Sequence, residues 1–346
     1  MRATLMQRGR LWVADLPAPQ PLRGEVLVKS RACGICGSDL HATRHTEEFV
    51  ATSREAGGAF KLTTLEPVVL GHEFCAEVVD YGPDTPHRFA PGTLVCSVPV
   101  LPRQQTLGLG YSAEAPGGFA EYMLLAAPLL VPVPNGLSAV HAALTEPMAV
   151  GRHAVAKARL AGRETALVLG CGPVGLAVVA ALRAAGAGPV IAADYSPRRR
   201  ELALQMGAHE AVDPAVASPY RAAVRGNGDG TVIFECIGVP GSIDQIFLGA
   251  PRDARIVVVG VCLQTDHCRP LIAVNKELSL QFVLGYSVEE FAQTLHLIAS
   301  GDIDVAPLIT GTVGLDGVAD AFAALADPEA HAKIVVEPWH SGAAHG

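Results

Sequence analysis

The chain has 346 residues, of which half are hydrophobic, and a formal net charge of −8. A chain of this length and composition can bury large cores and is expected to form about two domains. Its 26 basic residues are scattered apart from one short arginine run, which disfavours nucleic acid and anionic membranes as partners and favours a small molecule.

The cysteines and the N-terminus predict a reducing, cytoplasmic setting. Eight cysteines are spread along the chain, and residues 1–22 contain proline and arginine where a secretory leader needs an uninterrupted apolar core. We therefore expect free or metal-bound thiols rather than disulfides. The uncharged stretch 166–182 approaches the length of a membrane span, but its three glycines and one proline indicate a buried strand, a turn and a helix.

The first 130 residues predict an irregular, mostly β domain, because short extended runs alternate with proline and glycine about every ten residues. The predicted strands are 25–29, 75–81, 93–100 and 119–125. The polar segment 42–67 is too long and too irregular for a simple connection. We interpret it either as a lid over a site or as a mobile excursion.

From residue 138 onward, alanine-rich helical stretches alternate with β-branched runs, which predicts a doubly wound parallel sheet. A helix over 139–160 is expected to be interrupted at Pro147. Further along, we predict strands at 165–169, 190–193, 232–236 and 256–261, and helices at 175–185 and 197–206. The remaining predicted elements are helices 291–300 and 318–326 and strand 332–336.

A glycine-rich turn predicts a dinucleotide site. Strand 166–169 runs into a G-x-G-x-x-G turn and an apolar helix, so glycine permits the tight turn and the helix N-terminus faces a pyrophosphate. Asp194 ends the next strand, where a carboxylate accepts hydrogen bonds from ribose, which favours NAD over NADP. The predicted cofactor-binding residues are Gly170, Gly172, Pro173, Val174, Gly175, Asp194 and Arg199.

The arginines at 198–200 leave this preference open to question. They could bind a 2′-phosphate, stack on adenine, or project from the first turns of a helix into solvent. Because Asp194 precedes them at the ribose position, we favour stacking or solvation.

Candidate metal ligands come from three separate stretches. Cys36 precedes Ser38, Asp39 and His41, while His72 and Glu73 follow Gly71, and Glu146 precedes Pro147. A histidine next to a glutamate is by itself more often a structural pair. Together with Cys36, however, these residues offer the mixed sulfur, nitrogen and oxygen donors that a catalytic zinc uses.

With these motifs in place, the chain resembles the zinc-dependent medium-chain alcohol and polyol dehydrogenases, in particular the branch similar to sorbitol and threonine dehydrogenases. The resemblance rests on stretches that appear in family order: 24–29, 34–41, 71–73, 117–122, 146–147 and the glycine turn. It implies an α/β fold in which a GroES-like, mostly β catalytic domain (1–150) is followed by a doubly wound Rossmann domain (151–289). The C-terminal part (290–346) would return to the catalytic domain.

The resemblance also implies roles for the residues of the site. Cys36 and His72 would bind zinc, and Glu73 and Glu146 would compete for the remaining positions. Asp39 would accept the second ring N–H of His72, although it could instead cap a turn. Ser38 would contact the alcohol oxygen, and His41 would pass the proton to solvent.

The activity implied is hydride transfer between NAD and a secondary alcohol, a polyol or an amino alcohol. We expect one zinc per chain, because Cys96 is the only cysteine in the lobe where a structural zinc of the family needs four. A homo-oligomer, a tetramer or else a dimer, is also implied. The alternatives are a zinc-free quinone or enone reductase of the same fold and a non-catalytic nucleotide-binding protein, and the complete set of metal donors disfavours both.

Overall fold

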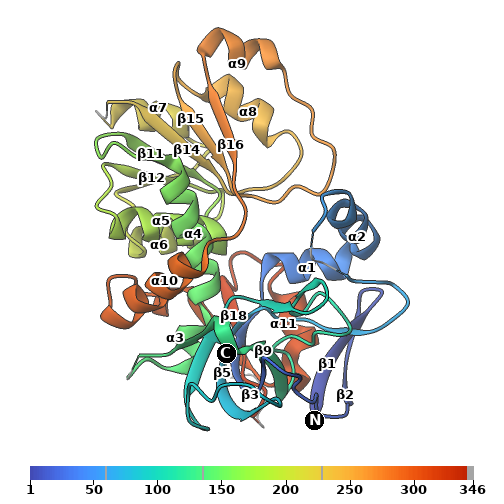
Figure 1. Ribbon diagram of the computed structural model, residues 1–346. Coiled ribbons are helices and arrows are strands. Elements are labelled where there is room, and N and C mark those ends of the chain that lie inside the picture. Colours follow the sequence, from blue (N-terminus) through green and yellow to red (C-terminus); the bar gives the residue numbers. More distant parts are fainter. Residues whose placement is uncertain (59–60, 135, 227–228, 341–346) are drawn as a thin grey trace. The chain divides into compact units, whose positions relative to one another are not determined.

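The structure is a computed structural model that describes residues 1–58, 61–134, 136–226 and 229–340 (Figure 1). The chain forms two compact units: the first comprises Met1–Glu146 with Ile309–Gly346, and the second comprises Pro147–Leu308. The domain boundaries predicted after residues 150 and 289 stay predictions.

The first unit is built around a seven-stranded sheet. Its strands are β3 (Glu25–Gly34), β5 (Glu73–Tyr81), β6 (Leu94–Ser97), β9 (Tyr122–Ala126), β10 (Leu130–Pro132), β17 (Ile309–Val313) and β18 (Lys333–Val336). Their order is β10-β6-β5-β3-β18-β17, with β9 also paired to β3. β3 is central, and its alternating Val26, Val28 and Ala32 are completely buried because successive side chains of a strand point to opposite faces.

Smaller elements complete this unit. A three-stranded sheet contains β1 (Arg2–Gln7), β2 (Arg10–Asp15) and β4 (Val68–Val69). A hairpin is formed by β7 (Val100–Pro102) and β8 (Thr106–Gly108). The helices are α1 (Gly37–Arg44), α2 (Thr46–Glu55), α3 (Ala139–Ala143) and α11 (Val318–Ala324), with 3-10 turns η1 (Ala127–Leu129) and η3 (Leu315–Gly317). The predicted mostly β character is confirmed, although strand 93–100 divides into β6 and β7.

The C-terminal segment joins the sheet of the N-terminal unit, as predicted. β18 runs antiparallel to β3, with Val335 opposite Gly34 and Val336 opposite Cys33. β17 pairs in parallel with β18. β18 therefore lies beside residues about 300 positions earlier in the chain.

The segment between residues 41 and 68 is more regular than its sequence suggested. Helix α2 occupies Thr46–Glu55, and residues 59 and 60 lie outside the described part. Phe49 is 5% exposed and Leu62 is 1% exposed, so two apolar side chains of this polar segment are buried, whereas Leu65 is 77% exposed. Helix α2 is regular structure within this segment, while the two interpretations of the segment, a lid or a mobile excursion, stay predictions.

The second unit contains the predicted parallel sheet. Its strands are β11 (Thr165–Leu169), β12 (Val190–Ala193), β13 (Glu210–Val212), β14 (Thr231–Glu235), β15 (Arg255–Val258) and β16 (Ser279–Phe282). All pair in parallel in the order β13-β12-β11-β14-β15-β16. Leu167, Ile191, Ile233 and Ile256 from the central strands form its core. The doubly wound fold is confirmed.

Helices accompany this sheet, as Figure 1 shows. They are α5 (Pro173–Ala184), α6 (Pro197–Gln205), α7 (Pro219–Arg225), α8 (Ser242–Gly249), α9 (Pro270–Lys276) and α10 (Val288–Ser300), with the 3-10 turn η2 (Ala306–Leu308). The stretch 166–182 is β11, a turn and most of α5, as predicted. No helix in the described part of the chain is long and apolar enough to cross a membrane.

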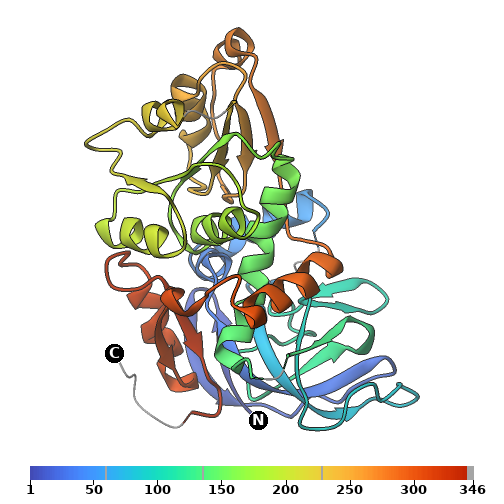
Figure 2. The ribbon, with the colours of Figure 1, turned by 90° about the vertical axis from the view of Figure 1, so that its left-hand side faces the viewer.

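The predicted break at Pro147 is wrong. The chain forms α3 and then α4 (Thr145–Ala158), and the break lies at Leu144. Pro147 is in the first turn of α4, where a backbone N–H has no helical partner and proline is tolerated. Farther along, α4 lies beside α10 (Figure 2), and His153 Nδ1 lies 2.8 Å from Glu290 Oε2.

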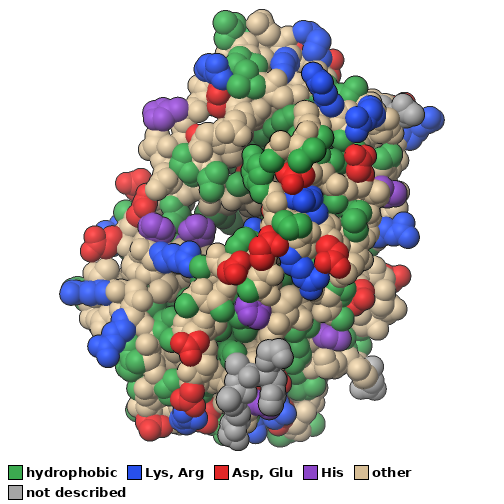
Figure 3. All heavy atoms as spheres, turned by 180° about the vertical axis from the view of Figure 1, so that it is seen from behind, with side chains coloured by type: hydrophobic (Ala, Val, Ile, Leu, Met, Phe, Trp, Pro, Cys, Tyr) green, Lys and Arg blue, Asp and Glu red, His purple; other side chains and the backbone are tan. Residues whose placement is uncertain are grey.

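Charged side chains of both signs are interspersed on the face shown in Figure 3, without a continuous basic field among the described residues there. An apolar surface is found instead at the edge strand β16, where all four residues are exposed, including Leu280 and Phe282. Leu271 and Val274 of α9 are exposed as well.

Candidate metal centre and dinucleotide site

The start of α1 carries the first group of candidate residues. Cys36 precedes the helix, and its backbone N–H donates to Asp39 Oδ2 at 3.0 Å. This contact satisfies a backbone donor at the helix N-terminus, and the negative charge suits the positive end of the helix dipole. Asp39 therefore does cap the turn, as the alternative interpretation held.

Three of the four predicted ligands converge. Cys36 Sγ, a ring nitrogen of His72 and a carboxylate oxygen of Glu73 all lie within 4.8 Å of one another. Glu73 begins β5 opposite Gly34 at the end of β3, so the pairing of these strands brings the two stretches together. A Cβ at Gly34 would lie 2.1 Å from Glu73 Oε2, so only glycine leaves room for this carboxylate.

His72 is held from its other side by Asp39. Its Nδ1 lies 3.4 Å from Asp39 Oδ1, at the long limit of a hydrogen bond, and no other described residue is a closer partner. Burial lowers the pKa of His72, but the charges of Asp39 and Cys36 and hydrogen bonds to both outweigh burial and raise it well above its usual range. Such an anionic environment also favours a bound cation, so these donors fit a zinc ion.

A lysine that sequence reasoning missed completes this cluster. Lys333, on β18, is 1% exposed, and its ammonium lies 2.7 Å from both carboxylate oxygens of the fully buried Glu73. It also donates to the carbonyl of Ile35 at 2.9 Å. Burial lowers the pKa of Lys333, but the charges of Glu73 and Cys36 raise it overall. A single lysine in the apolar run 332–336 was the available signal, because a charge there must find a partner.

A tyrosine was missed as well. Tyr111 is 3% exposed, and its hydroxyl lies 2.8 Å from Ser38 Oγ and 3.4 Å from Asp39 Oδ1. Ser38 Oγ lies in turn 3.5 Å from Nε2 of His72. Burial is the main cause that raises the pKa of Tyr111, followed by the negative charges of Asp39 and Cys36. No motif in the sequence marks this residue.

Glu146 and His41 are less closely tied to the cluster. Glu146 lies in the first turn of α4, and its negative charge contributes to the raised pKa values of Tyr111 and Lys333. The three-residue metal group does not include it. The ring of His41 lies 6.4 Å from that of His45, and burial, with the positive charges of His45 and Arg44, lowers its pKa.

In the second unit, the glycine turn has the predicted local geometry. Gly170 has a φ of +86°, and a Cβ at Gly175 would lie 1.9 Å from the Gly170 carbonyl oxygen, so both positions need glycine. Pro173 and Val174 open α5 directly after Gly172. These residues thus form the strand, turn and helix in which a pyrophosphate is bound in this type of fold.

Asp194 links this turn to the next helix. Its Oδ2 accepts from the N–H of Cys171 at 2.7 Å, and its Oδ1 accepts from that of Ser196 at 2.9 Å. Nη1 of Arg199 lies 3.9 Å from Asp194 Oδ2, while Nε of Arg199 is buried without a hydrogen-bond partner in the described residues.

The other two arginines of the run pair with other acidic residues. Arg198 pairs with Glu201 at 2.8 Å, and Arg200 pairs with Asp213 at 3.2 Å. Arg200 also donates to the carbonyls of Asp194 and Tyr195. Arg199 is therefore the member of the run whose guanidinium lies nearest the carboxylate of Asp194 without an acidic partner elsewhere among the residues that the structure describes.

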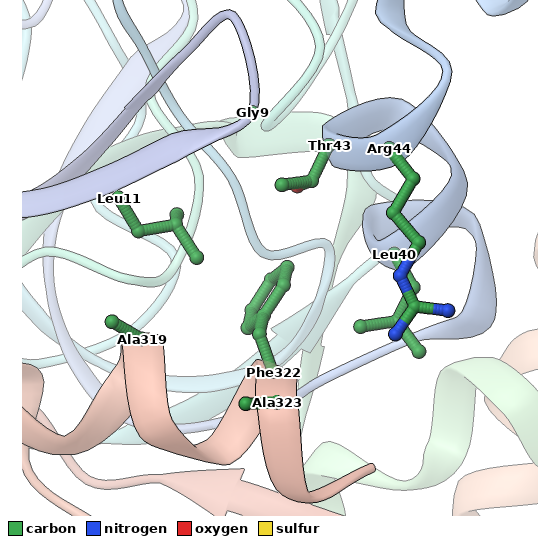
Figure 4. Close-up of a pocket in the computed structure, with 8 residues that line it drawn as sticks. All are labelled: Gly9, Leu11, Leu40, Thr43, Arg44, Ala319, Phe322 and Ala323. Atoms are coloured by element: carbon green, nitrogen blue, oxygen red, sulfur yellow. The ribbon is translucent and has the colours of Figure 1, made fainter. Parts of the chain in front are cut away.

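A separate cavity of about 270 Å³ lies in the first unit (Figure 4). Leu11, Leu40 and Phe322 line it together with the aliphatic part and guanidinium of Arg44. None of its lining residues belongs to the predicted site.

Comparisons with known proteins identify the family of the chain. Residues 22–135 match the alcohol dehydrogenase GroES-like domain, and residues 173–300 match the zinc-binding dehydrogenase domain. The chain is 32% identical to (R,R)-butanediol dehydrogenase of Bacillus subtilis over 94% of this chain and 96% of that protein. It is 29% identical to sorbitol dehydrogenase of Bacillus subtilis (93% and 92% covered) and 33% identical to L-threonine 3-dehydrogenase of Bacillus licheniformis (85% and 86% covered).

Solved structures show the same similarity. The crystal structure of 2R,3R-butanediol dehydrogenase from Bacillus subtilis has a TM-score of 0.83 at 30% identity, covering 97% of this chain and 99% of that one. A zinc-binding dehydrogenase from Sinorhizobium meliloti 1021 bound to NADP has a TM-score of 0.83 at 28% identity, with the same coverage. An alcohol dehydrogenase from E. coli CFT073 complexed with NADH also has a TM-score of 0.83, at 25% identity and the same coverage. The chain therefore belongs to the zinc-binding medium-chain dehydrogenases and is an oxidoreductase of the alcohol and polyol dehydrogenase type.

Proposed function

We propose that this enzyme transfers a hydride between NAD and a secondary alcohol, a polyol or an amino alcohol, giving a ketone or an aldehyde. The observation that carries the proposal is the convergence of Cys36, His72 and Glu73 donors within 4.8 Å. When bound there, zinc would act as a Lewis acid and make a substrate hydroxyl easier to deprotonate. The names of the butanediol, sorbitol and threonine dehydrogenases support this range of substrates.

The side chains around this cluster would orient the ligands and move the proton. Asp39, 3.4 Å from Nδ1 of His72, would fix the orientation of that ring and leave Nε2 for the metal. Ser38 would accept the proton of the substrate hydroxyl, and His41 would pass it to solvent. The lowered pKa of His41 supports this role, because a neutral imidazole can accept a proton near neutrality.

Both acidic ligand candidates remain in the proposal. Glu73 lies in the cluster, but its two oxygens are bound to the ammonium of Lys333. Glu146 would approach from the first turn of α4. Zinc with Cys36, His72 and one of these carboxylates would have the three protein ligands of a catalytic site and an open position for substrate.

NAD is the proposed cofactor, with NADP less suited to the site. Each carboxylate oxygen of Asp194 accepts one backbone hydrogen bond and keeps a further lone pair for a ribose hydroxyl. Its negative charge would repel a 2′-phosphate, and Arg198 and Arg200 are already paired with acidic residues. The ratio of kcat/KM for NAD and NADP tests this proposal, and a clear preference for NADP would contradict it.

The central experiment is a screen of the zinc-loaded enzyme for NAD reduction with simple alcohols, 2,3-butanediol, sorbitol and L-threonine. We expect turnover with at least one class, no metal and no activity in Cys36→Ala, and a 10²- to 10⁴-fold slower reaction in His41→Ala, which is the usual contribution of acid–base help. Full activity of the metal-free protein, or quinone reduction without zinc, would support the zinc-free reductase instead.

A further inference from the structure

Tyr111 occupies a position in the metal centre that packing alone does not explain. It follows β8 and is 3% exposed, yet its hydroxyl lies within the polar cluster, 2.8 Å from Ser38 Oγ and 3.4 Å from Asp39 Oδ1. A phenol can be buried only where its hydroxyl finds partners. Here the nearest partner is the hydroxyl that we propose receives the substrate proton.

The ring of Tyr111 is fixed on two sides. Its centroid lies 5.2 Å from that of His72, and it stacks on Phe49 of α2 with centroids 5.7 Å apart. Its backbone carbonyl accepts from the N–H of Lys61 at 2.7 Å. Parts of the segment between residues 41 and 68 therefore hold Tyr111 against the metal centre.

Ser38, by contrast, has little else to select its rotamer. It is half-buried on the first turn of α1, and its other polar neighbour, Nε2 of His72, is 3.5 Å away. A serine hydroxyl can occupy three staggered positions, and a 2.8 Å hydrogen bond to a fixed phenol favours one of them.

We propose that Tyr111 is a positioning residue that holds the Ser38 hydroxyl toward His72, and that Phe49 on α2 holds Tyr111 in place. This inference rests on the proposed function of Ser38. The phenol donates its proton to one lone pair of Ser38 Oγ, which leaves the second lone pair for the proton of the substrate hydroxyl and the proton of Ser38 for onward transfer. Helix α2 is then a fixed wall of the site.

The first test is a double-mutant cycle with Tyr111→Phe and Ser38→Ala. Tyr111→Phe keeps the ring contacts and removes the hydroxyl. We expect kcat to fall about 10- to 100-fold, because the Ser38 hydroxyl would be misplaced, and KM to change less. In the Ser38→Ala background the same substitution should have no further effect, because Tyr111 acts through Ser38. An equal fall in both backgrounds would show a merely structural role and overturn the proposal.

Two further variants accompany this cycle. Tyr122→Phe is the matched control, since Tyr122 is on β9 with its ring 5.4 Å from that of Trp339, and it should leave kcat unchanged. Phe49→Leu should lower kcat, as Tyr111→Phe does. It should have this effect only in enzyme that retains Ser38. A loss in the Tyr122 control equal to that of Tyr111→Phe would count against the proposal.

A crystal structure of the zinc-loaded Tyr111→Phe variant provides a readout that does not depend on activity. We expect full zinc content and a Ser38 side chain that leaves its rotamer or occupies several. An unchanged Ser38 rotamer, or loss of zinc, would overturn the proposal. If the parent enzyme oxidises none of the alcohols, the proposed function fails, while the Ser38 rotamer still decides whether Tyr111 positions it.

Discussion

Lys333 and Glu73 form a fully buried ion pair whose charges depend on each other. Burying two charges costs several kcal/mol each, and their mutual attraction and hydrogen bonds offset that cost only while both are present. The pKa of Lys333 is raised, so the lysine keeps its charge at neutral pH. The charged lysine therefore stabilises the folded state fully at pH values below 10.5, the pKa of lysine in the unfolded chain. This stabilisation is lost only as the pH rises through the higher pKa of Lys333 in the folded protein.

We therefore expect Lys333→Met to lower the free energy of unfolding of the metal-free protein by about 3–5 kcal/mol, because Glu73 is left buried without a cation. Urea unfolding followed by circular dichroism measures this change. Lys29→Met is the matched control: Lys29 lies 3.9 Å from the ring centre of Trp339 at a half-buried position, and its loss should cost about 1 kcal/mol. Equal effects of the two substitutions would contradict the importance of the buried pair.

The residues that the sequence predicted are those whose motifs are local. Cys36, Ser38 and Asp39 share one helix start, and His72 and Glu73 are neighbours, so their chemistry is visible in short stretches. Lys333 and Tyr111 were not predicted, because the role of each depends on a contact with residues far away in the chain. Tyr111 is 73 positions from Ser38, and only the fold brings them together.

Among the elements, buried parallel strands were the easiest to predict. β11 and β12 were predicted to the residue, since strands covered on both faces appear as continuous apolar runs between turn residues. α2 was missed because its one buried aromatic residue, Phe49, lies in a helix whose other residues are mostly polar. β16 was not predicted, although Leu280 and Phe282 alternate with Ser279 and Gln281, because a run of four residues is too short to distinguish a strand by its pattern alone.

Helix α10 begins with a capping box. Ser287 Oγ accepts from the N–H of Glu290 at 3.1 Å, and Glu290 Oε2 accepts from the N–H of Ser287 at 2.8 Å, a reciprocal capping box. Ser287→Ala should lower the free energy of unfolding by about 1 kcal/mol, because a helix N-cap is lost.

Thermal unfolding with a second serine variant checks this expectation. Ser300 is the last residue of α10 and is exposed, so Ser300→Ala should change the free energy of unfolding by less than about 0.5 kcal/mol. If both variants unfold at the temperature of the parent protein, the capping box does not stabilise the helix.

For the whole molecule, we expect one zinc ion per chain. In the described part of the chain, the group Cys36, His72 and Glu73 is the one set of donors close enough to hold a metal. Cys96 is completely buried, and its Sγ lies 3.4 Å from the carbonyl of Ala142. Elemental analysis should find one zinc in the parent and in Cys96→Ser, and none in Cys36→Ala; two per chain would show a structural site.

We also predict that the chain associates with itself, as a tetramer or else as a dimer. The exposed edge strand β16 and its apolar Leu280 and Phe282 support it, because unpaired apolar edges of this kind pair with another chain unless they are covered. Light scattering coupled to size-exclusion chromatography should show an oligomer that Phe282→Asp reduces in size. A monomeric parent protein would contradict the prediction, and Val216→Asp, at an exposed position away from β16, is the control.

The pairing of Glu73 with Lys333 also constrains when the metal centre can be completed during protein synthesis. The two residues are 260 positions apart in the chain. At a synthesis rate of about 5–20 residues per second, Lys333 is added roughly 13–52 s after Glu73. The second unit, whose residues all precede Lys333, can close its parallel sheet during that interval. Glu73 gains its buried partner only when β18 arrives, so we expect zinc to enter a finished chain rather than a nascent one.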